Sequence, residues 1–495
     1  MGRMQDAPRH RRLPRALLYQ LHRILPDDAL LTEPEELRPY ECDGLSAYRR
    51  LPAAVALPRD ADEVRAVVAA CREHQVPIVA RGAGTGLSGG ALPREDALVL
   101  SLARLNRILN IDPDNRLAVV QPGVRNLMVS QAARPHGLFY APDPSSQIAC
   151  TIGGNVAENS GGVHCLKYGL TVHNLRALTV LTIDGETLEL GGPALDAPGP
   201  GLLPLFTGSE GLLGIVLEVT LRLLPLPPAA AVLLLAFDSV EAAARTVADI
   251  IGAGLVPAGL ELMDRLATRA AEDFVHAGYP RDAGAVLLCE LDGTEAEVAA
   301  QIERVRAVAR AQGCIGLEIA RDEAERQRLW AGRKAAFPAA GRLAPDYYCM
   351  DGTIPRHALP QVLARIEALS RRYGLGVVNV FHAGDGNLHP LILYDANRPG
   401  ELEKAERMGD DILAACVEAG GTITGEHGVG VEKLDAMCHQ FATPELAQFH
   451  AVKAALDPLE LLNPGKAIPT LHRCAELGRM HVHGGRLPHP ELERF

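Results

Sequence analysis

The sequence predicts an α+β protein with at least two domains, and three observations support this fold class. The chain has 495 residues, which is more than one ordinary hydrophobic core accommodates. From Leu51 to Leu224, short β-branched or leucine-rich runs alternate with helix-like stretches and dense glycine loops. The proline-rich segment Leu224–Pro228 then interrupts both patterns. We therefore expect an N-terminal arm at 1–50, a first domain at 51–228, a second domain at 229–468 and a tail at 469–495.

In the first domain, hydrophobic patterning predicts one helix and four strands. The helix is expected at Asp62–His74, and the strands at Pro77–Ala80, Ala97–Leu102, Leu117–Gln121 and Ile215–Leu223. Before this domain, Met1–Leu25 is rich in arginine, as transit peptides are. It lacks the apolar core of a signal peptide, and we expect a solvated arm.

The second domain begins with six elements in a recognisable order. Strand, helix, strand, strand, helix and strand are predicted at Val232–Phe237, Val240–Gly252, Leu260–Met263, Val286–Leu291, Thr294–Gln312 and Gly316–Ala320. This is the order of a split βαβ, ferredoxin-like unit. A further α+β stretch follows to about Leu462.

Composition restricts the possible functions. A formal charge of −12 argues against a general nucleic-acid binder, because phosphate neutralisation needs a basic face. The ten cysteines include no Cys-x-x-Cys pair and no run that would ligate an iron–sulfur cluster, so we expect reduced thiols. No apolar run approaches the roughly 20 residues of a membrane-spanning helix. We expect a cytoplasmic protein.

Three glycine-rich loops are the first functional signal. They are Arg81–Ala91, Pro142–Gly162 and Thr207–Gly214, and they combine glycines with small hydroxyl and amide side chains. Such loops let successive backbone N–H groups point at one anion, as a pyrophosphate requires. One such loop is often only a tight turn, but three in one domain favour a nucleotide cofactor. No acidic residue stands where a dinucleotide-binding Rossmann fold needs one, which argues against a nicotinamide cofactor.

A second signal is a cluster of metal-ligand types. His382 and His389 flank a Gly-Asp-Gly-Asn turn between the strand-like runs Val377–Phe381 and Pro390–Tyr394, so a hairpin would bring them together. With Glu426 they would give two imidazoles and one carboxylate, which leaves positions open on a divalent metal. His427 is then free to act as a base. The alternative is that each histidine is a hydrogen-bonded packing residue.

The three loops, in this order, resemble the flavin-binding domain of the vanillyl-alcohol oxidase / p-cresol methylhydroxylase family. This resemblance implies a two-subdomain FAD-binding domain of the p-cresol methylhydroxylase type, followed by the ferredoxin-like substrate (cap) domain. It implies noncovalent FAD, with His164 as the alternative attachment site. The implied FAD contacts are Arg81, Gly82, Ala83, Gly84, Thr85, Gly86, Ser88, Gly89, Pro142, Asp143, Pro144, Ser145, Ser146, Gly153, Gly154, Asn155, Ser160, Gly161 and Gly214.

The second domain is similar to that of FAD-linked D-2-hydroxy acid dehydrogenases. By this resemblance His382, His389 and Glu426 bind zinc, manganese or iron, and His427 is the catalytic base. Arg333 would hold the substrate carboxylate, although a surface helix charge explains it equally well. Asn463, in Asn-Pro-Gly-Lys, would lie beside the flavin unless the motif is an ordinary helix-ending turn. Phe337 and Cys349 stand where relatives that oxidise dicarboxylates carry polar anchors, which implies a smaller substrate.

Within that family the match to glycolate oxidase catalytic subunits runs nearly end to end. It includes Tyr40–Tyr48, His164–Gly169, Tyr347–Thr353 and the tail from Leu471 to Phe495. It implies oxidation of glycolate, and of D-lactate, with a second FAD-binding subunit and an iron–sulfur subunit as partners. Contact with the inner face of the plasma membrane would then be only through those partners. The tail residues His472, Cys474, His481, His483 and His489 suggest either a metal site or a docking segment, and their spacing favours docking.

Other functions stay open at this point. D-lactate and D-2-hydroxyglutarate dehydrogenases belong to the same family. A zinc hydrolase with structural glycine loops, or a subunit that binds flavin without turnover, would belong to a different class.

Overall fold

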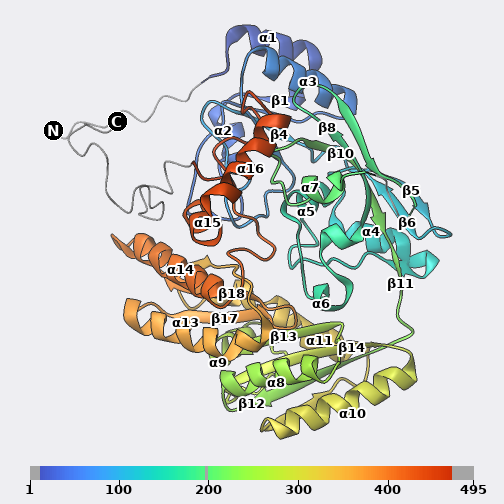
Figure 1. Ribbon diagram of the computed structural model, residues 1–495, viewed down its shortest axis with the longest axis vertical. Helices are drawn as coiled ribbons and strands as arrows, with labels where there is room; N and C mark the ends of the chain where they lie inside the picture. The colour runs from blue at the N-terminus through green and yellow to red at the C-terminus, as the bar shows by residue number, and fades with distance from the viewer. Residues whose placement is uncertain (1–11, 195–198, 471–495) are drawn as a thin grey trace.

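The computed structural model describes residues 12–194 and 199–470, which form two α+β halves (Figure 1). The upper half in Figure 1 contains sheets of four, five and two strands, and the lower half is built on one seven-stranded sheet. Within the described ranges, no helix combines the length and the apolar composition that a membrane span requires.

The four-stranded sheet positions the first glycine loop. Its strands follow the order β1 (Leu30–Leu31), β2 (Ala54–Ala56), β4 (Leu98–Ser101), β3 (Ile78–Arg81). Helix α3 (Ala61–Glu73) packs on this sheet through buried valines, and it begins where the Asp60 side chain accepts hydrogen bonds from two backbone amides of the first turn. The first loop leaves the sheet at the end of β3.

The N-terminal segment is part of this half, so the prediction of a solvated arm is wrong for the described residues. Helix α1 (Arg15–Ile24) packs against α3, and Leu17 and Leu21 are fully buried. Strand β1 pairs antiparallel with β2. Between them lie the short helix α2 (Pro34–Leu37) and one 3-10 turn, Arg38–Tyr40.

The five-stranded sheet carries the second and third loops. Strand β10 shows the pattern of a sheet with one buried face, because its residues alternate between buried and half-exposed. The strands run in the order β5 (Ile108–Asp112), β6 (Leu117–Val120), β10 (Ile215–Arg222), β8 (Leu175–Leu181), β9 (Thr187–Gly191). Helices α4 (Asn126–Ala133), α5 (Ile152–Glu158), α6 (Cys165–Tyr168) and α7 (Leu202–Phe206) accompany it, and β7 (Leu138–Phe139) pairs with β11 (Leu224–Pro225).

The lower half confirms the predicted ferredoxin-like unit. Its first four strands lie in the order β15-β12-β14-β13, which is the order 4-1-3-2 of that fold, and β17, β18 and β16 extend the sheet. The strands are β12 (Ala229–Phe237), β13 (Gly259–Asp264), β14 (Ala285–Gly293), β15 (Gly316–Ile319), β16 (Asp346–Cys349), β17 (Val377–His382) and β18 (Asn387–Tyr394).

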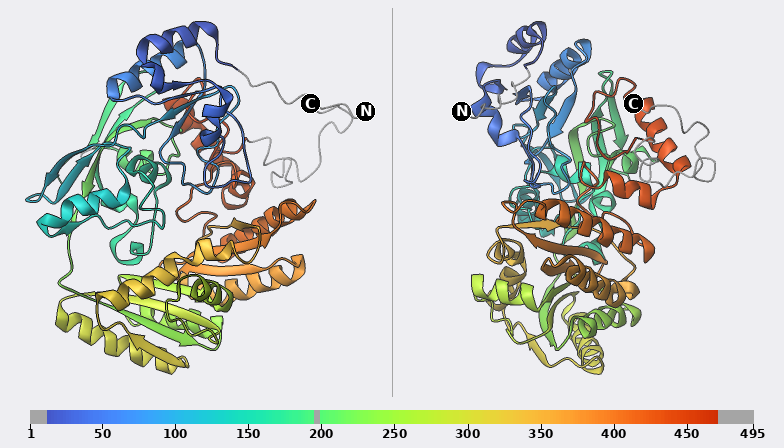
Figure 2. Two further views of the ribbon diagram at one scale, coloured as in Figure 1. Left: turned by 180° about the vertical axis from the view of Figure 1, so that it is seen from behind. Right: turned by 90° about the vertical axis from the view of Figure 1, so that its left-hand side faces the viewer.

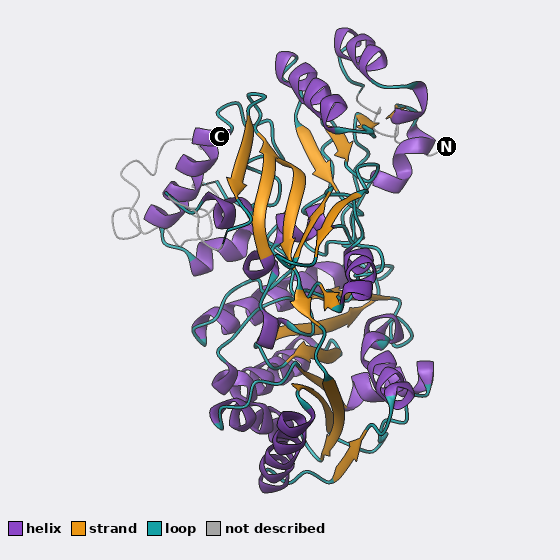
Figure 3. Ribbon diagram, turned by 90° about the vertical axis from the view of Figure 1, so that its right-hand side faces the viewer, coloured by secondary structure: helices purple, strands orange, loops and turns teal. Residues whose placement is uncertain are grey.

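Helices cover both faces of this sheet (Figure 3). One face packs against α8 (Val240–Gly252), α10 (Glu295–Ala311), α13 (Leu359–Tyr373) and α14 (Glu401–Glu418). The other packs against α9 (Arg265–Val275), α11 (Glu323–Lys334) and α12 (Ala336–Ala340). Alternate residues of β12 belong to the two cores, so the strand is buried on both sides.

The end of the described chain returns to the upper half, where α15 (Leu434–Gln440) and α16 (Thr443–Leu456) are visible (Figures 1 and 2). Leu462 forms a parallel bridge with Ile78, and the Lys453 ammonium donates to the Leu212 carbonyl at 2.7 Å. The last part of the segment predicted as the second domain, 229–468, therefore packs on the upper half. The predicted docking tail from Leu471 onward lies outside the described residues.

Cysteines in the described ranges are mostly free. Eight are thiols, and six of these are buried.

Candidate functional site

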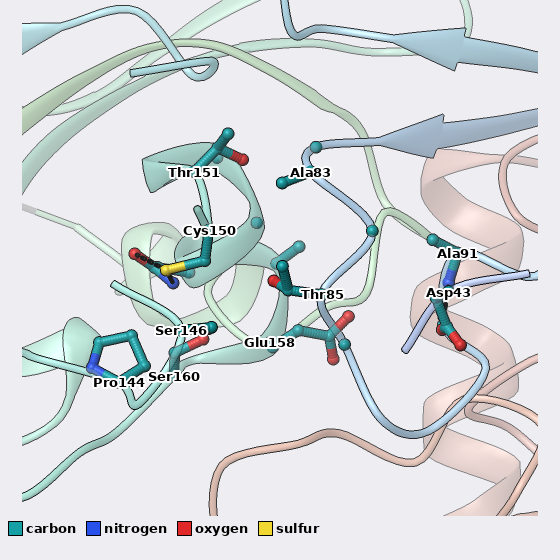
Figure 4. Close-up of a pocket in the computed structure, with 18 of the residues that line it drawn as sticks. Asp43, Ala83, Thr85, Ala91, Pro144, Ser146, Cys150, Thr151, Glu158 and Ser160 are labelled. Carbon is teal, nitrogen blue, oxygen red and sulfur yellow. Dashed lines mark hydrogen bonds between the residues drawn. The ribbon is translucent and has the colours of Figure 1, made fainter. Parts of the chain in front are cut away.

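A cavity of about 380 Å³ lies between the glycine loops and the lower half of the molecule, which we call the cap half. Figure 4 shows part of its lining from the upper half. All three loops line it, and on the cap side it reaches Lys334, Phe337, His389, Glu426 and His427. Of the residues predicted to contact FAD, those that line the cavity are Arg81, Gly82, Ala83, Gly84, Thr85, Gly86, Pro144, Ser145, Ser146, Gly153, Gly154, Asn155, Ser160 and Gly214.

The glycines keep this cavity open. A Cβ added to Gly82 would lie 2.3 Å from the Thr151 hydroxyl, and Gly84 has a φ of +72°, which favours glycine. The Thr151 hydroxyl is buried and has no hydrogen-bond partner within the described ranges. A narrow cradle of backbone with a free hydroxyl in its wall fits a nucleotide cofactor.

Six predicted contacts are not among the residues that line the cavity: Ser88, Gly89, Pro142, Asp143, Gly161 and Asn463. Ser88 is fully buried, and its hydroxyl donates to the carbonyl of His427 at 3.0 Å. The Asn463 amide donates to the carbonyls of Gly90 and Glu210 at 3.0 and 2.7 Å. The Ser88 and Asn463 side chains therefore hold loops together. A resemblance between motifs does not distinguish such residues from those that line the cavity.

His164 is occupied by protein partners. Its Nδ1 lies 2.8 Å from the Asp143 carboxylate and its Nε2 lies 3.9 Å from Glu290. The ring does not line the cavity. This arrangement does not favour His164 as a flavin attachment site.

The β17–β18 hairpin brings His382 and His389 together, as the turn sequence predicts. Their ring centroids are 5.0 Å apart, and both residues are 2% exposed. The Glu426 Oε1 lies 3.4 Å from the Nε2 of His382 and 3.1 Å from the Nε2 of His389. Gly161 allows this approach, because a Cβ there would lie 2.8 Å from the second Glu426 oxygen.

These three side chains fit a divalent metal. One donor atom from each lies within 4.8 Å of the others. The second Glu426 oxygen and the Nδ1 of His389 are buried without a hydrogen-bond partner in the part of the chain described. Two imidazoles and one carboxylate suit zinc, manganese or iron and leave coordination positions open.

His427 stacks on the metal-ligand candidate His389. The two rings are nearly parallel, at 7°, with centroids 5.0 Å apart. Burial lowers the pKa of His427 to about 4. The imidazole is therefore neutral near pH 7 and has a ring nitrogen available to accept a proton.

Arg333 differs from its prediction. It is 2% exposed, does not line the cavity, and its Nη2 forms an ion pair with Glu261 at 2.6 Å. The next residue, Lys334, lines the cavity instead. Phe337 also lines it, with its ring edge-on to His389 at 6.0 Å.

Three buried carboxylates at this site escaped the sequence analysis. Asp351 accepts hydrogen bonds from the backbone of the segment that carries Glu426 and His427. Glu210, in the third glycine loop, accepts from the amides that follow His427, and Glu261 contacts His382. The sequence offered one indication for two of them: Asp351 precedes a glycine in Tyr347–Thr353, and Glu210 precedes a glycine in Thr207–Gly214.

Comparisons with known proteins agree with this geometry. Residues 52–191 match the FAD binding domain, and residues 226–467 match the C-terminal domain of FAD linked oxidases. The chain is 63% identical to glycolate oxidase subunit GlcD of Escherichia coli K12 over 97% of this chain and 96% of the relative. It is 41% identical to that subunit of Bacillus subtilis, over 86% and 91%, and 33% identical to a D-lactate dehydrogenase of Anaerostipes hadrus, over 86% and 91%.

Solved structures agree on the fold. A p-cresol methylhydroxylase with bound substrate superposes with a TM-score of 0.78 at 18% identity, over 92% of this chain and 97% of that one. An alkyldihydroxyacetonephosphate synthase gives 0.73 at 18% identity, over 92% and 86%. The predicted p-cresol methylhydroxylase-type fold is confirmed.

Proposed function

This chain belongs to the family of FAD-linked oxidases, and on that premise we propose that it oxidises glycolate to glyoxylate as the FAD-binding subunit of a glycolate oxidase. The observation that carries the proposal is the 63% identity to an Escherichia coli glycolate oxidase subunit over nearly the full length of both chains. D-lactate, which yields pyruvate, is the expected second substrate, because D-lactate dehydrogenases are among the relatives.

Two bound groups supply chemistry that side chains lack. FAD, held by the glycine loops, would supply the acceptor for the hydride, while the protein provides position and surroundings. A divalent cation held by His382, His389 and Glu426 would act as a Lewis acid toward the substrate oxygens. The glycine loops would hold FAD along the cavity, and His389 and Glu426 line its cap side, so a substrate in the cavity would be close to both groups.

His427 is the proposed base. It lines the cavity, and its backbone amide donates to Asp351 at 2.9 Å, which holds the residue in place. Because burial keeps the imidazole neutral, it can accept the proton of the substrate hydroxyl as the hydride leaves the carbon. Removal of one proton and one hydride converts a 2-hydroxy acid to a 2-oxo acid.

The substrate is proposed to be small. Phe337 fills part of the cavity wall beside His389, and Lys334 is the cap-side cation that lines the cavity. A carboxylate can pair with Lys334, whereas Arg333 already has Glu261 as its partner. One cation and one aromatic ring suit a monocarboxylate better than a dicarboxylate.

We propose that electrons from the reduced flavin leave through another protein. None of the cysteine spacings in the chain fits an iron–sulfur cluster. We propose a second FAD-binding subunit and an iron–sulfur subunit as partners, with any membrane contact made through them.

Anaerobic addition of glycolate to the purified yellow protein tests the function. The flavin absorbance should bleach, and a panel of 2-hydroxy acids should rank glycolate and D-lactate above D-2-hydroxyglutarate. A yellow protein that no 2-hydroxy acid bleaches would contradict the proposal.

Metal binding is tested separately. His382→Ala and Glu426→Ala should lose the metal and the activity yet keep FAD, because the flavin loops lie in the other half. Full activity of the wild-type protein without bound metal would show that these residues are hydrogen-bonded packing residues and not metal ligands.

A further inference from the structure

A buried carboxylate stands directly behind one of the three metal-ligand candidates. Glu261 lies on the central strand β13, is 1% exposed and does not line the cavity. The Nδ1 of His382 lies 2.9 and 3.0 Å from its two oxygens. From the other side, the Nη2 of Arg333 lies 2.6 Å from Oε2.

A carboxylate at this position needs a reason. Burying a charge costs several kcal/mol unless it is paired, and apolar strands surround Glu261 on the sheet. Its partners are Arg333 and His382, and neither is a surface residue. Any contribution of Glu261 to the site must therefore pass through His382.

The geometry specifies what Glu261 does to the imidazole. When a carboxylate accepts from Nδ1–H, the ring is fixed in the tautomer whose Nε2 carries a free lone pair. The Nε2 of His382 points toward Glu426, at 3.4 Å from Oε1. His389 has no comparable support, because its Nδ1 lacks a hydrogen-bond partner among the described residues and the nearest carboxylate oxygen, of Asp351, is 4.0 Å away.

We propose that Glu261 is a positioning residue for the metal centre, and that Arg333 holds Glu261 in place. This inference rests on the proposed metal site and goes beyond it, since it makes His382 the most firmly oriented of the ligands. Arg333 then acts behind the site instead of on the substrate.

Metal affinity tests the proposal without relying on activity. Zn²⁺ binding to the FAD-loaded protein is measured by competition with a chromogenic chelator, for wild type, Glu261→Gln and Glu290→Gln. Glu290 is the control because it is a largely buried carboxylate on the neighbouring strand β14, where it accepts from Trp330 and does not touch the ligands.

Glu261→Gln should bind Zn²⁺ about 10- to 100-fold more weakly than wild type, the usual effect of removing an outer partner of a ligand. Glu290→Gln should leave the affinity unchanged, and the flavin spectrum should be normal in both. If Glu261→Gln does not fold, Glu261→Asp is measured. It keeps the charge but shortens the reach to His382, and it should also weaken binding.

Three results would overturn the inference. Unchanged affinity in the folded Glu261 variant shows that the contact with His382 does not support the metal. Equal weakening in the Glu290 variant shows a general effect of altering the sheet. A wild-type protein that binds no Zn²⁺ removes the metal site itself, and that result appears before any variant is compared.

Discussion

Replacing Asp351 with asparagine should destabilise the protein and disorder the segment that carries the proposed base. The Asp351 carboxylate is fully buried and accepts hydrogen bonds from the backbone amides of Gly425, Glu426 and His427 at 3.1, 3.2 and 2.9 Å. The ammonium of Lys433, also fully buried, donates to it at 3.1 Å. An asparagine keeps one acceptor oxygen but turns an NH₂ group toward these donors.

The largest loss of stability in Asp351→Asn comes from the unpaired charge of Lys433. Breaking a buried ion pair by removing one partner costs about 3–5 kcal/mol, because the remaining charge is left without compensation. Lys433 would keep three partners, the Gly428 carbonyl at 2.9 Å, the Thr424 hydroxyl at 3.3 Å and the Glu432 carboxylate at 3.7 Å. We therefore expect the free energy of unfolding to fall by about 3 kcal/mol, the lower end of that range.

Urea titration of the FAD-loaded protein, followed by circular dichroism, measures this change. The double variant Asp351→Asn/Lys433→Met is the control, because it removes both members of the Asp351–Lys433 ion pair. It should be more stable than the sum of the single changes predicts, by about 1–3 kcal/mol. A loss below about 1 kcal/mol in Asp351→Asn, or strict additivity in the double variant, would refute the reasoning.

The effect should also depend on pH. Burial alone would raise the pKa of Asp351, but His427, Lys433 and His389 together hold it well below its ordinary value. A carboxyl whose pKa is lower in the folded state contributes stability that is complete above its unfolded pKa of about 4 and is lost as the pH falls further. The stability difference between wild type and Asp351→Asn should therefore shrink below about pH 4.

Three further predictions concern catalysis and cofactor. His427→Ala should slow flavin reduction by glycolate by about two to four orders of magnitude in stopped-flow experiments, and an unchanged rate and pH profile would exclude it as the base. Acid precipitation should release yellow FAD into the supernatant, whereas colour in the washed pellet would indicate a covalent link. Lys334→Gln should raise the KM for glycolate about two- to fivefold at low salt, with kcat nearly unchanged. Lys404→Gln, a change on α14, should not, and equal effects would deny Lys334 a role at the cavity.

The sequence was most informative where local pattern and capping residues agree. The helix predicted at Val240–Gly252 has those bounds, because Ser239 caps its first turn and the apolar spacing is regular. The helix after Thr294 is capped in the same way, by a capping box with Glu297. Helix α9 was not predicted, because its buried positions are alanines and a threonine instead of large apolar residues, although its polar and less polar residues lie on clearly separate faces.

The N-terminal error has a similar physical cause. Leu13, Leu17, Leu21 and Leu25 are spaced by four and are all buried, which is the spacing of one helix face. The arginines of Met1–Leu25 suggested a solvated arm, but Arg15 and Arg23 lie on the exposed face of helix α1. Periodicity was the better guide than composition here.

In the site, local motifs located the ligand candidates but not their supports. A hairpin sequence brings His382 and His389 together, and glycines mark the segment that carries Glu426 and His427. Glu261, by contrast, is a lone acid within a buried strand, and its partners are more than 70 residues away in the chain. Pairing at that range depends on the sheet register, which one sequence does not reveal.

The segment that carries Glu426 and His427 is held by a carboxylate from each half of the molecule. Asp351, from the cap half, accepts from its amides before the turn at Gly428, and Glu210, from the third glycine loop, accepts from the amides of Val429 and Gly430 at 2.7 Å each. The hydrogen bonds to Asp351 fix the proposed base relative to the metal-ligand candidates. The hydrogen bonds to Glu210 fix it relative to the glycine loops. The proton and the hydride leave the same carbinol group of the substrate, so the base must be correctly placed relative to both the metal-ligand candidates and the FAD loops. A segment anchored to only one half of the molecule would leave its distance from the other half free to vary.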